Sequence, residues 1–335
     1  MRTFIYSCAF IALGFMSFRW ICGNIFPYQP SHFPVPFYPF QDNPPDSLMV
    51  EIGKRLFFDP KLSANNSISC ASCHSPFNAF AHTDHELSHG IHDSIGNRNA
   101  PALFNLAWQQ SFMWDGAINH LDVQPLAPIS HAAEMGSSIN EVIQKIEAIT
   151  LYRNLYFEAC GDSSISSAKI LKALAQYQLT LVSANSKYDR VVQGQEKFSV
   201  QEEKGYKLFL KNCNRCHTEP LFSNFSFEKN GLALDPDLND QGRYRVTLLE
   251  EDRMKFKVPS LRNLVFTYPY MHDGRFATLK EVIHHYAGDF NTKLDSSEKA
   301  SKAIILNPND QVDLIAFLLT LSDKEFVFDP KHLLK

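Results

Sequence analysis

The sequence has little net charge and no cluster of basic residues. Its 335 residues carry a formal net charge of −4. A nucleic-acid-binding protein needs a concentrated basic surface, so this composition gives no reason to expect nucleic acid as a partner. The chain also has no low-complexity tract, and its hydrophobic share of 44% is typical of a globular protein.

Cysteines are too few for a framework of disulfide bonds. Four of the seven lie in two Cys-x-x-Cys-His motifs, and Cys8 and Cys22 lie in or beside an apolar N-terminal segment. Only Cys160 remains in the body of the chain. We therefore expect no set of structural disulfides, even in an oxidising compartment.

The N-terminal segment is typical of an export signal. Arg2 is followed by a charge-free, mostly apolar run over 4–18. That run is shorter than the about 20 apolar residues that a spanning helix needs. We expect residues 1–23 to be a signal peptide or an N-terminal anchor, with cleavage left open, and the protein to be periplasmic.

Proline restricts the next segment. Residues 24–46 are rich in proline and aromatic residues, which excludes helix and favours an extended lead-in. A free linker is one interpretation. The alternation of phenylalanine with proline favours the other, in which the lead-in packs along the folded body.

Two parts of the remaining chain are similar to each other. Glu51–Phe58 precedes the first Cys-x-x-Cys-His motif, and Glu203–Leu210 precedes the second. A repeat on this scale predicts two related domains, which we place at 47–193 and 194–335. The boundary follows the end of the helical spacing in 170–183. Strand signals are few, so we predict a mainly α protein with two domains and long loops.

The two Cys-x-x-Cys-His motifs predict covalently bound haem. In this motif the two thiols add to the haem vinyl groups and the histidine ligates the iron. A zinc site would need a compact set of four ligands, and neither motif has a second cysteine pair nearby. We expect two haem c groups, with these residues as attachment sites and axial ligands: Cys70, Cys73, His74, Cys213, Cys216 and His217.

Further motifs resemble those of a known family. Asn99-Ala100-Pro101, Phe112–Gly116 and Tyr268–Arg275 occur in the order found in the bacterial di-haem cytochrome c peroxidases, which include a branch named for MauG. The resemblance covers nearly everything after the lead-in. It implies two cytochrome c-like domains, an N-terminal peroxidatic one and a C-terminal electron-transfer one, with a calcium site between them.

The resemblance also implies which residues serve the first haem. The family has a tryptophan between the haems, followed at fixed spacings by Gln, Pro and Glu, and these positions are Trp114, Gln124, Pro128 and Glu134 here. Peroxide cleavage needs a group that takes a proton from one oxygen and returns it to the other, a role that suits Glu134, especially if burial raises its pKa. Gln124 would orient peroxide, Pro128 would keep the space free of side-chain ligands, and Trp114 would pass electrons.

One position separates the branches of this family. Fourteen residues after the histidine of the His-Asp-Gly motif, peroxide-scavenging members have Met, whereas the MauG branch has Tyr. Here that position is Tyr286, which we expect to be the sixth ligand of the second haem, with His284 or His285 as alternative ligands and a packed core tyrosine as the other interpretation. A phenolate ligand lowers a haem potential relative to a thioether, which would favour oxidation of a substrate over removal of peroxide.

Two further assignments come from the resemblance. His89 is the nearest candidate for a histidine that closes the first haem until reduction, although we favour an exposed loop histidine. Calcium would be bound by the side chain of Asn99 and the main-chain carbonyls of Thr267 and Pro269, because oxygen ligands suit calcium.

The sequence therefore predicts a peroxide-dependent oxidoreductase. In one version a small cytochrome c or cupredoxin supplies electrons and hydrogen peroxide becomes water. In the MauG-like version electrons are drawn from a protein substrate through the second haem. The alternative is a di-haem electron-transfer or haem-sensing protein without peroxidase turnover, which would not need Glu134.

Overall fold

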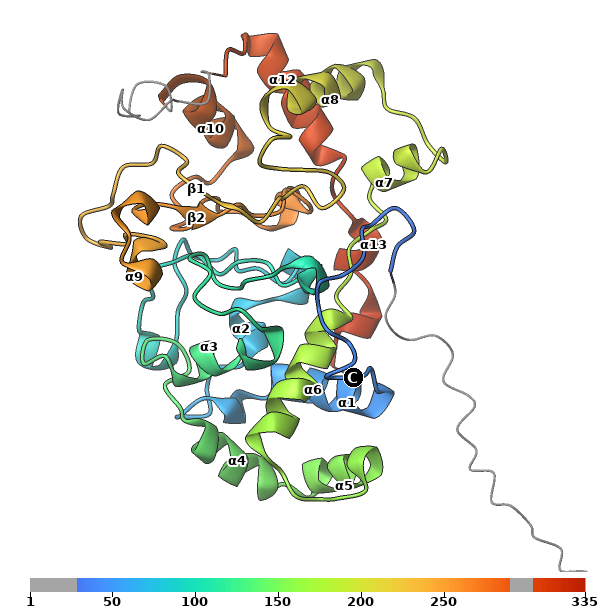
Figure 1. Ribbon diagram of the computed structural model, residues 1–335, viewed down its shortest axis with the longest axis vertical. Helices are drawn as coiled ribbons and strands as arrows, with labels where there is room; N and C mark the ends of the chain where they lie inside the picture. The colour runs from blue at the N-terminus through green and yellow to red at the C-terminus, as the bar shows by residue number, and fades with distance from the viewer. Residues whose placement is uncertain (1–28, 290–303, 335) are drawn as a thin grey trace, which may run out of the picture.

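The computed structural model of the protein describes residues 29–289 and 304–334 (Figure 1). The predicted export segment 1–23 lies outside this range, as does the start of the lead-in. No helix within the described residues is long and apolar enough to cross a membrane.

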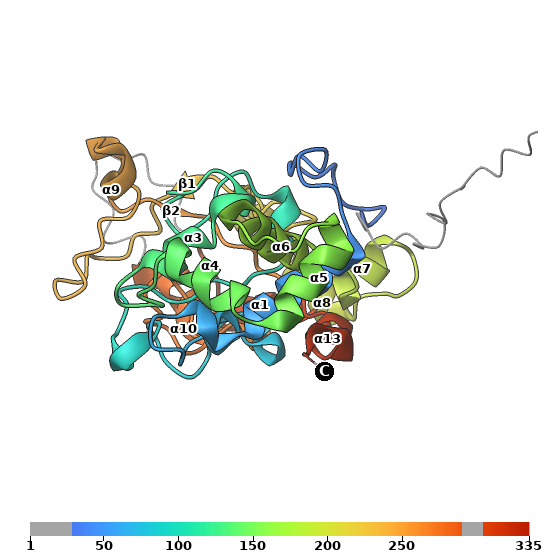
Figure 2. The same cartoon turned by 90° about the horizontal axis from the view of Figure 1, so that it is seen from below.

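The first half of the chain is helical, with long connecting loops. Its helices are α1 (Ser47–Phe58), α2 (Cys70–Cys73), α3 (Leu126–Ser130), α4 (Ile139–Glu147), α5 (Thr150–Cys160) and α6 (Ser167–Leu179). The side chain of Asp46 caps the start of α1, and Ser166 caps α6. Figure 2 shows α4 and α5 on the outer side of the central α1 and α6.

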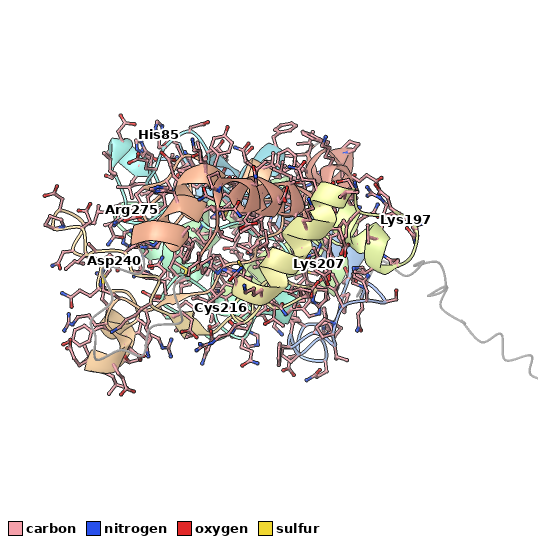
Figure 3. The ribbon with its side chains drawn as sticks, turned by 90° about the horizontal axis from the view of Figure 1, so that it is seen from above. His85, Lys197, Lys207, Cys216, Asp240 and Arg275 are labelled. Carbon is pink, nitrogen blue, oxygen red and sulfur yellow. The ribbon has the colours of Figure 1, made fainter. Side chains whose placement is uncertain are left out.

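The second half contains the remaining helices and one small sheet. The helices are α7 (Lys187–Val192), α8 (Val200–Asn212), α9 (Tyr244–Thr247), α10 (Leu279–His284), α12 (Pro308–Leu319) and α13 (Lys324–Val327). The strands β1 (Phe227–Glu228) and β2 (Phe256–Lys257) pair antiparallel. α8 and α12 pack side by side over a core that includes Phe209 and Phe317 (Figure 3).

The two similar sequence segments each form a helix that packs closely against a second helix in its own half. A Cβ at Gly53 of α1 would lie 1.9 Å from the carbonyl oxygen of Ala173 in α6. A Cβ at Gly205 of α8 would lie 1.9 Å from the carbonyl oxygen of Asp313 in α12. Only glycine allows this approach, because backbone occupies the place of a side chain. The predicted mainly α fold with long loops is thus confirmed.

Both ends of the described chain pack on the first half. Phe33 and Tyr38 of the lead-in are buried in a cluster with Trp108, so the lead-in does pack along the folded body. Phe326 and Val327 of α13 belong to the core of the first half rather than to that of the second. Figure 1 shows α13 at the side of the molecule, near the level where the two halves meet.

Candidate functional site

A large cavity lies between the two halves. Its volume is about 1130 Å³, above the roughly 300–1,000 Å³ of an ordinary ligand pocket. Residues of both Cys-x-x-Cys-His motifs line it. Cys70 lines an adjoining cavity of about 60 Å³, together with Cys73 and His74. One space thus reaches both motifs.

His74 is held as a neutral imidazole. It follows directly after α2, and its Nδ1 lies 2.9 Å from the carbonyl oxygen of Phe80. Because a carbonyl can only accept, Nδ1 carries the proton and Nε2 is the atom left for a metal. Burial lowers the pKa of His74 to about 4, so the imidazole stays neutral at neutral pH.

His217 repeats this arrangement in the second half. Its Nδ1 lies 3.2 Å from the carbonyl oxygen of Phe222 and 3.1 Å from that of Pro259. Burial lowers the pKa of His217 to about 4. Both axial candidates are therefore neutral imidazoles whose orientation is set by backbone carbonyls.

The thiols are neutral as well. Burial raises the pKa of Cys70 to about 12 and that of Cys73 to about 11, and burial acts likewise on Cys213 and Cys216. No group of three or more Cys, His, Asp and Glu in the described ranges is arranged to hold a metal ion. Paired thiols, neutral histidines and a large shared cavity fit haem c and argue against zinc.

The four residues expected at the first haem are brought together. Trp114, Gln124, Pro128 and Glu134 all line the large cavity with His74. Gln124, Pro128 and Glu134 also line the small cavity at Cys70. Three of the four therefore lie on the side of the first motif.

Glu134 has the electrostatic setting of an acid–base group. Burial raises the pKa of its carboxyl, and the charge of His131 partly opposes this. Nδ1 of His131 lies 3.6 Å from Oε1 of Glu134, and the His131 side chain is 54% exposed. His131 thus connects the cavity rim with solvent. His131 was not predicted from the sequence, although it lies only three residues before Glu134.

Trp114 is held by both halves of the molecule. Its Nε1 donates to the carbonyl oxygen of Asn99 at 2.9 Å. Its own carbonyl oxygen accepts from the backbone N–H of Lys257 in β2 at 2.7 Å. The indole therefore lies in the shared cavity with its backbone bonded to the second half.

The turn that carries Trp114 recurs in the second half. Phe112 pairs with Ile118, and Tyr270 pairs with Phe276, each through an isolated antiparallel bridge. The residues after Phe112 and Tyr270 are both methionines with positive φ, 69° and 79°. The turns place Trp114 and His272 at equivalent positions, an extension of the repeat that the sequence analysis did not include.

Of the three candidate ligands on the second haem, Tyr286 alone lines the cavity. It stands near Cys213 and Cys216, and burial raises its pKa. His285 instead has its Nε2 at 2.8 Å from the carbonyl oxygen of Asn230, and His284 is exposed. A π-helix at His285–Asp289 follows α10 at this point, a distortion frequent at functional sites.

His89 is half-buried rather than exposed. Its ring stacks on that of His85, with centroids 4.1 Å apart and planes 9° apart. Its carbonyl oxygen accepts from Sγ of Cys73 at 3.5 Å, and it lines the small cavity with Glu134. The loop thus touches the first motif, and a role for His89 as a ligand stays a prediction.

The three residues expected to bind calcium, Asn99, Thr267 and Pro269, all line the cavity between the two halves. Asn99 is buried, its Nδ2 donates to the carbonyl oxygen of Glu86 at 3.0 Å, and its backbone N–H donates to that of His272 at 2.7 Å. Its Oδ1 is the atom available to a cation.

Comparison with known proteins gives the family. Residues 47–197 match the model described as di-haem cytochrome c peroxidase, and residues 202–322 match cytochrome c. The chain is 36% identical over 306 residues to the methylamine utilization protein MauG of Methylophilus methylotrophus. The aligned region covers 88% of this chain and 87% of that protein. The chain belongs to the di-haem cytochrome c peroxidase family.

Other relatives of this di-haem peroxidase agree. It is 37% identical over 251 residues to the cytochrome c551 peroxidase of Nitrosomonas europaea, covering 72% of this chain and 73% of that one. A crystal structure of a MauG-like protein associated with microbial copper homeostasis superposes with a TM-score of 0.80 at 30% identity, covering 91% of this chain and 98% of that chain.

These findings confirm the predicted family and, with it, the predicted fold and class of enzyme. The protein has two cytochrome c-like domains and is a di-haem oxidoreductase of the class that uses peroxide. Two haem c groups are its cofactors. The relatives include both versions of the predicted function, so the choice between the versions depends on the site.

Proposed function

We propose that this di-haem peroxidase works in the MauG-like manner. Peroxide would react at the haem on His74, and the haem on His217 would be closed by Tyr286. The observation that carries the proposal is the position of Tyr286 in the cavity beside Cys213 and Cys216. His285 is bonded to the backbone of Asn230 instead.

The residues at the first haem would manage protons. The haem that His74 would hold would supply the redox chemistry for O–O cleavage, and the two electrons of the overall change H₂O₂ + 2 e⁻ + 2 H⁺ → 2 H₂O would come finally from the substrate. Glu134 would accept a proton from one peroxide oxygen and donate it to the leaving oxygen. Gln124 would orient peroxide by hydrogen bonding, and Pro128, which has no polar side chain, would leave the iron's open side without a ligand.

Electrons would reach this site by way of Trp114. Trp114 lines the cavity that both motifs line. Its indole donates to the carbonyl oxygen of Asn99, and its own carbonyl oxygen accepts from the backbone N–H of Lys257. With Tyr286 as a hard oxygen ligand, the second haem would have a low potential and would favour higher iron oxidation states. It could then share the oxidising equivalents that peroxide leaves and take electrons from a substrate. A protein substrate suits this version, because a large donor cannot enter the cavity.

A second version remains a candidate because of one relative. The cytochrome c551 peroxidase of Nitrosomonas europaea shares 37% of aligned residues with this chain. In that version a small cytochrome c or a cupredoxin would deliver both electrons. His89 would then be the residue that closes the first haem before reduction.

Three further assignments complete the proposal. Calcium would bind at Asn99, Thr267 and Pro269, as oxygen ligands at the junction. The division into a peroxidatic domain at 47–193 and an electron-transfer domain at 194–335 follows the two haem motifs. Residues 1–23 would direct the protein to the periplasm as a signal peptide or anchor.

The deciding experiment adds one equivalent of peroxide to the fully oxidised protein and follows both haems by absorption. We expect a rapid change at both haems without prior reduction. Tyr286→Met should raise the potential of the second haem and make the reaction depend on prior partial reduction, whereas His285→Gln should change neither. An oxidised wild-type protein that ignores peroxide until it is partly reduced would favour the cytochrome-donor version. An unchanged potential of the second haem in Tyr286→Met would contradict the assignment of Tyr286 as its ligand.

A further inference from the structure

Lys257 is a cation in the cavity without an anionic partner. Its Nζ donates to Oε1 of Gln109 and to the carbonyl oxygen of Ser111, both at 2.7 Å. Both acceptors are neutral. In the described part of the chain no carboxylate lies within ion-pair distance of Lys257, and Asp115 acts on it only through space. The side chain is half-buried and lines the cavity.

Other enclosed cations of the molecule are matched. Arg98 pairs with Asp115 at 2.7 Å and with Asp240 at 2.6 Å. Arg262, which is fully buried, pairs with Asp189 at 2.7 Å. An enclosed ammonium is costly unless an opposite charge compensates it. Burial accordingly lowers the pKa of Lys257 to about 7. The protein therefore gives Lys257 no anionic partner, and an anionic group of a ligand bound in the cavity could take that place.

Lys257 also lies between the two redox sites. Its backbone N–H donates to the carbonyl oxygen of Trp114 at 2.7 Å. Two residues further on, the carbonyl oxygen of Pro259 accepts from Nδ1 of His217 at 3.1 Å. The short segment Lys257–Pro259 thus joins the tryptophan to the axial histidine of the second motif, and Lys257 lines the cavity that Trp114 and His217 also line.

We propose that Lys257 binds a propionate carboxylate of a haem at the junction of the two halves and raises the reduction potential of that haem. Each haem brings two propionates, which are anions that need partners in an enclosed site. A fixed positive charge favours the reduced state of a nearby iron, because that state carries one positive charge fewer. The inference rests on the proposed function only in that both haems occupy this cavity.

The test is a spectroelectrochemical titration of the holoprotein and its variants. Lys257→Met should lower the midpoint potential of at least one haem, and Lys257→Arg should keep it near the wild-type value. Lys257→Gln retains a donor for Gln109 and Ser111, so it tests the charge if the Met variant does not fold. Lys207→Met is the matched control. Lys207 lies on α8 with its side chain 72% exposed, where solvent screens its charge (Figure 3).

A second measurement identifies the carboxylate. Redox-difference infrared spectra of protein containing haem with ¹³C-labelled propionates should show a labelled carboxylate band that shifts in Lys257→Met but not in Lys207→Met. Equal potentials in wild type, Met and Gln variants would overturn the proposal, and so would a shift in potential without any change in the labelled band. Both readouts are independent of peroxide turnover, so a wild-type protein without turnover would count against the proposed function and leave this inference standing.

Discussion

At the scale of single residues, Glu134 is the group whose protonation should control the reaction with peroxide. Burial raises the pKa of its carboxyl above the ordinary value of about 4.3. The group must be ionised to accept a proton from peroxide. The rate should therefore be highest above the raised pKa and fall as the pH drops through it. Stopped-flow rates of peroxide reaction across pH measure this, with the midpoint expected above 4.3.

Two substitutions make this prediction specific. Glu134→Gln should remove the fall in rate at low pH, which we call the acid limb. It should also slow the reaction with peroxide by about 10²–10⁴-fold while haem loading is kept. His131→Gln should move the limb to higher pH, because the charge of His131 lowers the pKa of Glu134. A limb that persists in Glu134→Gln would assign the titration to another group. Indifference of turnover to Glu134→Gln would support a mere electron carrier.

Residue chemistry also sets what could be predicted from sequence. The haem motifs were predictable because both thiols and the histidine lie within five residues. Tyr286 was predicted, in preference to His285, only by its spacing from His272 in the family resemblance. The structure supports that preference by placing Tyr286 in the cavity and His285 against the backbone of Asn230. Lys257 was not predictable, because its acceptors Gln109 and Ser111 are about 150 residues away in sequence.

At the scale of elements, the paired helices depend on two glycines. Gly53 lies against the backbone of α6 and Gly205 against that of α12, so a methyl group at either would meet a carbonyl oxygen. Gly53→Ala and Gly205→Ala should each destabilise the protein by about 1–3 kcal/mol or more, since overpacking forces the helices apart. Chemical denaturation of the holoprotein measures the loss.

The control for these variants lies on α8, the helix that contains Gly205. Lys204 precedes Gly205 on α8 and is exposed, so Lys204→Ala should change the free energy of unfolding by no more than about 0.5 kcal/mol. Alanine has the higher helix propensity, so propensity alone would make both glycine variants more stable. A gain in stability would show that the helices separate without cost.

The helical segments at 51–58, 170–183 and 203–210 were predicted from the sequence, but their partners were not. The repeat around Gly53 and Gly205 predicted related domains because similar segments form similar pairings. Nothing in the sequence indicated that Phe326 and Val327 of α13 would pack in the core of the first half. That contact joins residues far apart in the chain, and only the fold brings them together.

At the scale of the whole molecule, the junction between the halves is the part that calcium would organise. Asn99 connects three features of it: its carbonyl oxygen accepts from Trp114, its backbone N–H donates to His272, and its Oδ1 is available to a cation. Thr267 and Pro269 line the same cavity from the second half, and their carbonyl oxygens would be the further ligands. An ion bound there would hold Trp114 in the same position relative to both haems.

Removing calcium should therefore lower activity and perturb both haem spectra reversibly. The measurement is dialysis of the holoprotein against a calcium-selective chelator, followed by spectra and peroxide turnover, then addition of calcium or, as a control, magnesium. Calcium should restore both signals, and magnesium should not, because it demands a tighter octahedral site. Asn99→Ala should behave like the chelated protein and should not respond to calcium. Full activity in metal-free wild-type protein would mean that the hydrogen bonds of Asn99 alone hold the two halves in register.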